Sequence, residues 1–182
     1  MDAMPLAWSG SGRGDYRESP LEVGRSTDFR YESHTIHEGI VEMESGLPQA
    51  MGGEETLEII MAAQEMRLHL YFTVFPTVLT RRAVLENVGQ QPITIGKMMS
   101  MMMDIYGEYE MTTFNGGWIA EMGKHTVPVQ GSRVVNESLT GASSNRHNAG
   151  FLLSQAGATE AWGRVYGFNL VYSGNHYGAA QR

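Results

Sequence analysis

Trp118 and Glu121 are the side chains whose types and spacing most readily suggest chemistry. Trp118 directly follows Asn115-Gly116-Gly117, so the sequence places an aromatic ring at a turn, where packing alone does not require one. Trp is a suitable stacking platform for the apolar face of a sugar, and Glu121 follows three residues later. The alternative is a Trp that covers the end of a β-sandwich. The sequence alone does not choose between these two interpretations.

Two other groupings have the residue types of a known kind of site but lack the rest of it. His34 and His37 stand three residues apart, yet they lie on an extended segment with no third metal ligand nearby. Ser143 or Ser144 with His147 has the types of a nucleophile and its base, but no acidic partner or strained turn accompanies them. We expect hydrogen-bonded histidines in the first case and hydrogen-bonded loop residues in the second.

A run of methionines occupies Met98-Met99-Ser100-Met101-Met102-Met103. Such a cluster can form an adaptable binding surface. It is more often a buried strand in which flexible side chains fill the core, and we expect this second role within a strand over 93–105.

Composition excludes several classes of function. The formal net charge of -7 disfavours a nucleic-acid partner and an anionic membrane surface, both of which need clustered Lys and Arg. Cysteine is absent, so neither disulfides nor thiolate metal sites are expected. We find no signal peptide, no apolar run of about 18 residues, no phosphate-binding loop and no dinucleotide fingerprint. We therefore expect a soluble, cytoplasmic protein with no cofactor and no metal.

The elements that must position these residues read as short strands. Met66–Val74 is the clearest, because Met66, Leu68 and Leu70 alternate with Arg67 and His69. Together the strand signals number about nine or ten at roughly ten-residue spacing, without a convincing amphipathic helix, which predicts an all-β antiparallel sandwich or barrel. The other expected strands are 28–36, 56–62, 78–88, 93–105, 108–114, 127–135, 137–141, 151–154 and 162–175. Residues 1–27 should be irregular with at most one short strand, and 28–182 should form the core.

The segment from Trp162 to Asn175 predicts the most informative strand. From Arg164 onward, bulky and aromatic residues alternate on both faces, and Ser173-Gly174-Asn175 closes the run. Because both faces carry bulk, we expect this strand in the middle of a stacked sheet.

Read in order, many segments resemble the N-terminal domain of glycoside hydrolase family 36 α-galactosidases. The likeness extends over almost the whole chain and ends in a Tyr-Ser-Gly-Asn signature at Tyr172–Asn175. The segments that carry it are Gly14–Arg17, Asp28–His34, Gly46–Pro48, Glu55–Ile59, Arg81, Glu86–Gly89, Met99-Ser100, Asp104, Tyr109-Glu110, Gly117-Trp118, Glu121, Gly141–Asn145 and Val165–Asn175.

The resemblance implies a β-supersandwich of the galactose-mutarotase type, truncated at both ends. In the family, two catalytic aspartates of a retaining mechanism lie in a (β/α)₈ barrel that follows this domain. The resemblance therefore implies a non-catalytic N-terminal domain fragment of an α-galactosidase acting on terminal α-linked galactose, as in melibiose or raffinose. No catalytic residue is expected in this chain, which alone should be inactive.

The resemblance also implies partners and a site. The domain would support the rim of the sugar pocket and oligomer contacts, with the barrel domain of the same chain as a partner. Trp118 and Glu121 match a Gly-x-Trp-x-Arg-Glu pattern, so they are the candidates for binding substrate. Ala120 stands where that pattern has Arg, and Asn145 and Ala149 replace a His and a Pro, which implies a repacked loop.

Two other functions remain open at this point. A stand-alone, lectin-like carbohydrate-binding sandwich would bind galactosides by itself and lose that affinity in Trp118→Ala. A structural oligomerisation domain would self-associate without any affinity for sugar.

Overall fold

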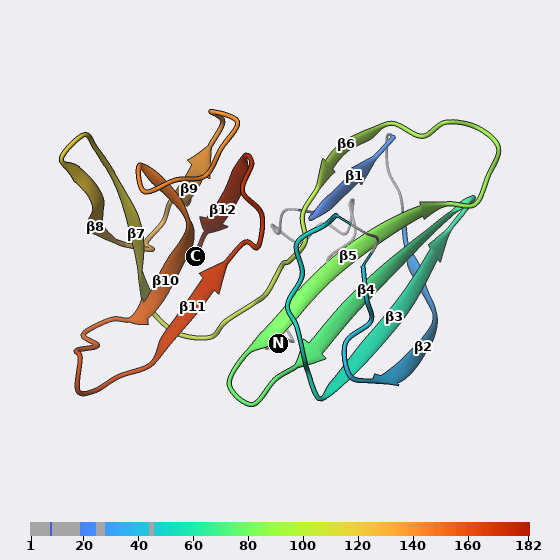
Figure 1. The fold of residues 1–182 in the computed structure, drawn as a ribbon, viewed down its shortest axis with the longest axis horizontal. Coiled ribbons are helices and arrows are strands. Elements are labelled where there is room, and N and C mark those ends of the chain that lie inside the picture. Colours follow the sequence, from blue (N-terminus) through green and yellow to red (C-terminus); the bar gives the residue numbers. More distant parts are fainter. Residues whose placement is uncertain (1–7, 9–18, 25–27, 44–45) are drawn as a thin grey trace. The chain divides into compact units, whose positions relative to one another are not determined.

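The computed structural model describes residues 8, 19–24, 28–43 and 46–182. The chain divides into two compact units, residues 1–105 and 106–182, which we describe separately. The described residues form twelve strands and no helix, so none of them builds a helix able to cross a membrane (Figure 1). The expectation of an all-β chain with antiparallel pairing is confirmed.

The first unit contains strands β1 to β6. Their bounds are β1 Leu21–Val23, β2 Arg30–Glu38, β3 Glu55–Ala63, β4 Met66–Val74, β5 Leu79–Asn87 and β6 Ile95–Met98. Strands β2 to β5 lie side by side in chain order as one antiparallel sheet, and β1 pairs with β6 (Figure 1). Most of residues 1–27, expected to be irregular, lie outside the described residues, and the described part contains β1.

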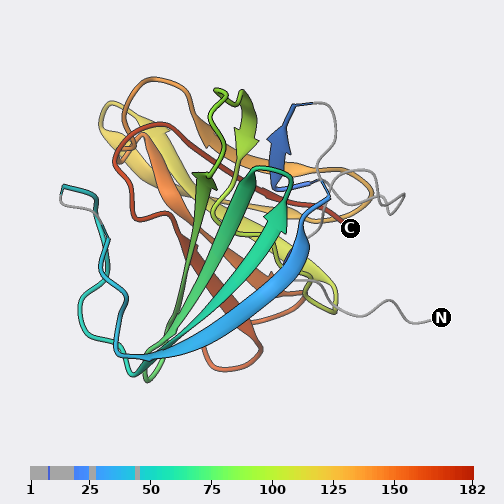
Figure 2. The same ribbon diagram turned by 90° about the vertical axis from the view of Figure 1, so that its right-hand side faces the viewer.

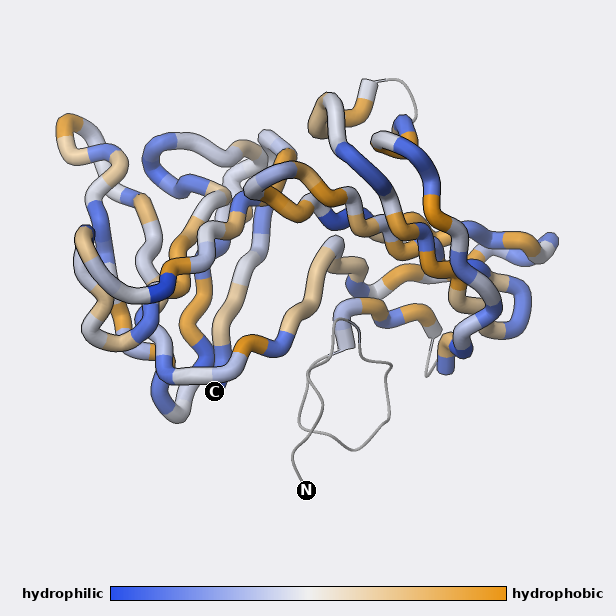
Figure 3. The backbone as a smooth tube through the Cα atoms, turned by 90° about the horizontal axis from the view of Figure 1, so that it is seen from below, coloured by the Kyte–Doolittle hydropathy of each residue, from blue (hydrophilic) through white to orange (hydrophobic). Residues whose placement is uncertain are grey.

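Alternation along β4 builds the core of this unit, as the sequence predicted. Leu68 is 0% exposed and Leu70 is 2% exposed, while Arg67, next to Leu68 in β4, faces the opposite side of the sheet. Residues of β1 and Phe29 pack with this apolar face of β4. Figure 3 shows that apolar and polar residues are interspersed along the backbone. Burying each such side chain contributes roughly 1.5–3 kcal/mol.

The edge strand β2 is long and curved (Figure 2). Its register with β3 shifts between Tyr31 and Ser33, which leaves Glu32 as an extra residue. A bulge of this kind bends a strand and increases its twist, which accounts for the curvature.

The second unit contains strands β7 to β12. Their bounds are β7 Tyr109–Gly117, β8 Ala120–Pro128, β9 Val134–Ser138, β10 His147–Gln155, β11 Val165–Asn169 and β12 His176–Ala180. One sheet has the order β11-β10-β7-β8, and β12 pairs with β9 as a separate ribbon. Met111 is fully buried, and the buried polar side chains include Asn136, Ser138 and His176.

The expectation of one buried strand over 93–105 is wrong. Only Ile95–Met98 is a strand, and its partner β1 has three residues, so the ladder ends before the methionine run. Met98 and Met103 are 40% and 45% exposed, which excludes a buried strand that fills the core with methionines. The backbone continues without strand pairing, and the carbonyl of Met102 accepts a hydrogen bond from Arg81.

The placement of Trp162–Asn175 in the middle of a sheet is also wrong. Only Val165–Asn169 forms a strand, β11, and β11 lies at the edge of its sheet. Tyr166 and Phe168 are half-buried and pack against β7 and β10, since Phe168 stacks on Phe151 with 4.9 Å between ring centroids. Beyond Asn169 the chain turns, and Ser173 accepts a hydrogen bond from the backbone N–H of Ser143 instead of pairing in the sheet.

Candidate functional site

The β7–β8 hairpin places Trp118 at its tip. Gly117 pairs with Ala120, so Trp118 and Ile119 form a two-residue turn, and the indole lies on a turn as the sequence indicated. Trp118 is 87% exposed and Ile119 is 86% exposed. An exposed pair of large apolar side chains at a turn has no packing role of its own, which favours contact with a ligand or partner.

The backbone at this tip is irregular and constrained. Ile119 has φ +71° and Met122 has φ +58°, a region that side chains other than Gly rarely adopt, least of all a β-branched one. Asn115 pairs with Gly123 and Gly117 with Ala120, so Gly116 faces two residues of β8, Glu121 and Met122. This bulge re-aims the side chain of Glu121 relative to the regular alternation of β8.

A second segment fixes the hairpin tip from the side. The N–H of Gly116 donates to the carbonyl of Arg146 over 3.0 Å, and the N–H of Met122 donates to the carbonyl of Asn145 over 2.9 Å. The segment is itself held by backbone hydrogen bonds between Ser144 and His147. Strain of the kind seen at Ile119 persists only where the surroundings determine the conformation, and these hydrogen bonds supply that support.

Arg146 is the residue of this site that sequence reasoning missed. Its backbone is held against Gly116, while its side chain is exposed and makes no hydrogen bond or ion pair within the part of the chain that the structure describes. Glu121 is likewise exposed and without such a partner there. Only the pairing of β7 with β10 brings Arg146 to the hairpin, and no local pattern in the sequence indicates it. We call Trp118, Ile119, Glu121 and Arg146 the tip surface.

The two discounted groupings are ordinary hydrogen-bonded residues, as expected. Ser143 Oγ donates to the carbonyl of Tyr172, and Ser144 Oγ accepts from the N–H of Arg146; no bond joins either hydroxyl to the ring of His147 in the described chain. His34 bonds Tyr31, and His37 bonds Glu58. The described residues contain no group of three or more His, Asp or Glu side chains placed to hold a metal ion.

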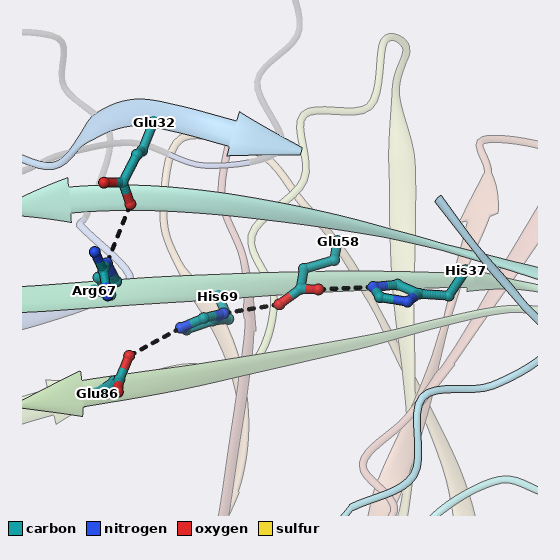
Figure 4. A network of polar contacts seen from close by, with 6 residues as sticks. All are labelled: Glu32, His37, Glu58, Arg67, His69 and Glu86. Carbon is teal, nitrogen blue, oxygen red and sulfur yellow. Dashed lines mark hydrogen bonds and ion pairs between the residues drawn. The ribbon is translucent and has the colours of Figure 1, made fainter. Parts of the chain in front are cut away.

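A separate polar cluster lies on the sheet of β2 to β5 (Figure 4). Glu58 bonds His37 over 2.7 Å and His69 over 2.8 Å. Burial raises the pKa of Glu58, but hydrogen bonds from His69, His37 and Tyr71 outweigh it, so its pKa lies below the ordinary value. Glu58 is therefore a carboxylate near neutral pH. The alternation along Met66–Val74 places His69 on the polar face of β4 but does not indicate this cluster.

Comparisons with known proteins cover the whole chain. The family model described as the glycosyl hydrolase family 36 N-terminal domain matches residues 1–182. The bifunctional α-galactosidase/sucrose kinase AgaSK of Mediterraneibacter gnavus is 31% identical over 188 residues, which cover 96% of this chain and 20% of AgaSK. The α-galactosidase AgaA of Geobacillus stearothermophilus is 32% identical over 189 residues, covering 96% of this chain and 26% of AgaA.

Solved structures give the same result. The galactosidase domain of AgaSK superimposes with a TM-score of 0.90 at 30% identity, covering 96% of this chain and 26% of that one. A doubly substituted variant of AgaA in complex with raffinose superimposes with a TM-score of 0.89 at 29% identity, covering 97% of this chain and 26% of that one. The likeness confirms the expected fold class, an all-β sandwich. This chain spans only 20% to 26% of the length of these relatives and matches their N-terminal part.

Proposed function

We propose that this chain, which belongs to the glycosyl hydrolase family 36 N-terminal domain family, is the non-catalytic N-terminal domain of an α-galactosidase. The observation that carries the proposal is the extent of the match, which takes in residues 1–182 here but about a fifth to a quarter of AgaSK and AgaA. The catalytic carboxylates of such a retaining enzyme would lie in the barrel domain outside these residues. Residues 28–182 would then be one part of that larger N-terminal domain.

The substrate we propose for the whole enzyme is terminal α-linked galactose, as in melibiose and raffinose. Substituted variants of AgaA have been solved in complex with raffinose and with stachyose, which supports this class of sugar for a relative of the same family. The main partner of this domain would be the barrel domain of the same chain, and the domain would also make homo-oligomer contacts. We propose the cytoplasm as the location of the enzyme.

The tip surface is our proposal for how this domain contributes to the rim of the sugar pocket. Trp118 offers an exposed indole on which the apolar face of a galactosyl ring can stack. Glu121 can accept and Arg146 can donate hydrogen bonds to sugar hydroxyls, because neither side chain has another polar partner among the described residues. The constrained hairpin would hold these groups in place before the sugar arrives, which lowers the entropy lost on binding.

A lectin-like module is the second candidate, and the exposed Trp118 on a rigid turn is the observation that favours it. Such a module would bind galactosides without any catalytic domain. A purely structural oligomerisation domain would not.

A hydrolysis assay with a calorimetric titration separates these functions. The purified chain is mixed with a chromogenic α-galactoside, and separately titrated with galactose, melibiose and raffinose. We expect no hydrolysis, because residues 1–182 match only the N-terminal domain of the relatives. We also expect no measurable heat at low sugar concentration, because the tip surface would form only one side of the sugar pocket. Heat without hydrolysis, lost in Trp118→Ala but kept in the control Trp162→Ala, would favour the lectin-like module. Hydrolysis by pure protein would contradict the proposal.

A further inference from the structure

The polar cluster on the first sheet joins four neighbouring strands in one row. His37 of β2, Glu58 of β3, His69 of β4 and Glu86 of β5 follow one another across the sheet (Figure 4). His69 bonds Glu58 through Nδ1 over 2.8 Å and approaches Glu86 through Nε2 over 3.4 Å. His69 therefore lies between two carboxylates on two different strands.

Counting the hydrogens fixes what each ring can do. A carboxylate only accepts hydrogen bonds, so His37 Nε2 and His69 Nδ1 must each carry a hydrogen to bond Glu58. A neutral imidazole carries one N–H, and that of His69 is used at Nδ1. Its Nε2 then presents a lone pair to the Glu86 carboxylate, which is repulsive. Only the protonated ring can donate to Glu58 and Glu86 at once.

Other charged groups on this face are engaged elsewhere. Arg67, beside His69 on β4, forms an ion pair with Glu32 of β2 over 3.2 Å. Arg82 of β5 lies over the ring of Tyr71, with 4.2 Å from its guanidinium carbon to the ring centroid. Tyr71 itself bonds Glu58. Directly opposite His69 on β5 is Val84, which carries no charge.

Partial burial makes the contact more than an exposed ion pair. The side chain of His69 is 18% exposed and that of Glu58 is 13% exposed, whereas that of Glu86 is 50% exposed. The bond between His69 and Glu58 is therefore shielded from water, whereas the contact between His69 and Glu86 is accessible to solvent.

We propose that His69 is a proton-dependent bridge between β4 and the edge strand β5. When protonated, its ring donates to Glu58 and Glu86 and ties β3, β4 and β5 together. When neutral, the ring keeps Glu58 and releases Glu86, so β5 loses a side-chain link to the sheet. Because only the protonated ring can donate at both nitrogens, the strength of the β5 attachment depends on pH.

A comparison of variants at two pH values tests the bridge. Glu86→Gln keeps the shape but removes the charge that His69⁺ attracts. The control is Glu55→Gln, an exposed carboxylate on β3 of the same sheet. The readout is the protection of β5 backbone amides against hydrogen exchange and the urea midpoint, both measured at about pH 5.5 and about pH 8.5.

At the lower pH, we expect the β5 amides to be about two- to fivefold less protected in Glu86→Gln than in Glu55→Gln. At the higher pH, we expect their protection to be the same in the two variants. In His69→Gln, the effect of Glu86→Gln should vanish at both pH values, since the partner is missing. Equal losses at both pH values would overturn the proposal, as would no loss at the lower pH. A loss that persists in His69→Gln would instead assign the effect to His37 or Arg67. If His69→Gln fails to fold, the pH dependence of Glu86→Gln alone decides.

Discussion

Gly116 is the position at which the rigidity of the hairpin tip can be tested most sharply. A Cβ atom added there would lie 1.9 Å from the carbonyl oxygen of Ala120 and 2.9 Å from its carbon. Both are backbone atoms, so Gly116→Ala must displace the β7–β8 ladder at its bulge. The neighbouring Gly117 offers a matched control, because a Cβ there meets no atom within 4 Å.

The expected cost follows from the contacts that the shift disturbs. Overpacking of this kind costs about 1–3 kcal/mol. The displacement also weakens the hydrogen bonds from Gly116 N–H to Arg146 and from Met122 N–H to Asn145, each contributing about 0.5–1.5 kcal/mol. Because the tip can relax partly toward solvent, we expect a local loss of about 2 kcal/mol, which is roughly 30-fold in an opening equilibrium.

Hydrogen exchange of the Met122 amide, assigned by NMR, measures this loss directly. Gly116→Ala should reduce its protection roughly 30-fold, and Gly117→Ala should leave it within about twofold of the parent. Urea unfolding of the same variants shows whether the effect is local. Equal protection in Gly116→Ala and Gly117→Ala would refute the account of a tip held by close backbone packing.

Three further predictions concern the cores and the buried ionisable groups. Leu68→Ala should destabilise the chain by about 2–5 kcal/mol in urea melts, since Leu68 is fully buried, whereas the exposed Leu139→Ala should change little. The pKa of Glu58 is lowered in the folded chain, so Glu58 stabilises the fold above the ordinary Glu pKa, and this contribution is lost as the pH falls through the lowered pKa. In urea melts, Glu58→Gln should therefore lose less stability on acidification than the parent chain. Burial, together with nearby His147, lowers the pKa of His176. The free energy of unfolding should therefore fall as the pH drops below the ordinary His pKa and through the lowered pKa of His176. In urea melts from about pH 7 to 5, His176→Gln should reduce this dependence of stability on pH, whereas His125→Gln, at an exposed position, should leave it unchanged.

Local patterns in the sequence predicted what depends on local alternation and turns. Met66–Val74 is a strand with its apolar face buried, because a period of two directly specifies which face is dry. Trp118 lies at a turn, as the preceding glycines indicated, although Asn115-Gly116-Gly117 are themselves the last residues of β7.

Long-range pairing decided the features that the sequence did not reveal. The methionine run is not a buried strand because β6 ends with its short partner β1. Strand β11 is an edge strand because, among the described strands, only β10 pairs with it. Arg146 reaches the tip surface only through the pairing of β10 with β7. The carboxylate of Glu58 meets His37 and His69 only through the register of three strands.

The most direct test of the central claim is a titration of the chain with raffinose, followed by NMR at the indole N–H of each Trp. Sucrose, which lacks the α-galactosyl group of raffinose, is the control sugar, and exposed Trp162 is the internal control. We predict that at high sugar concentration raffinose, and not sucrose, shifts the Trp118 signal, that Trp162 stays unchanged, and that no galactose is released. An unchanged Trp118 signal would contradict the sugar-contacting role of the tip surface, and released galactose would contradict the assignment of a non-catalytic domain.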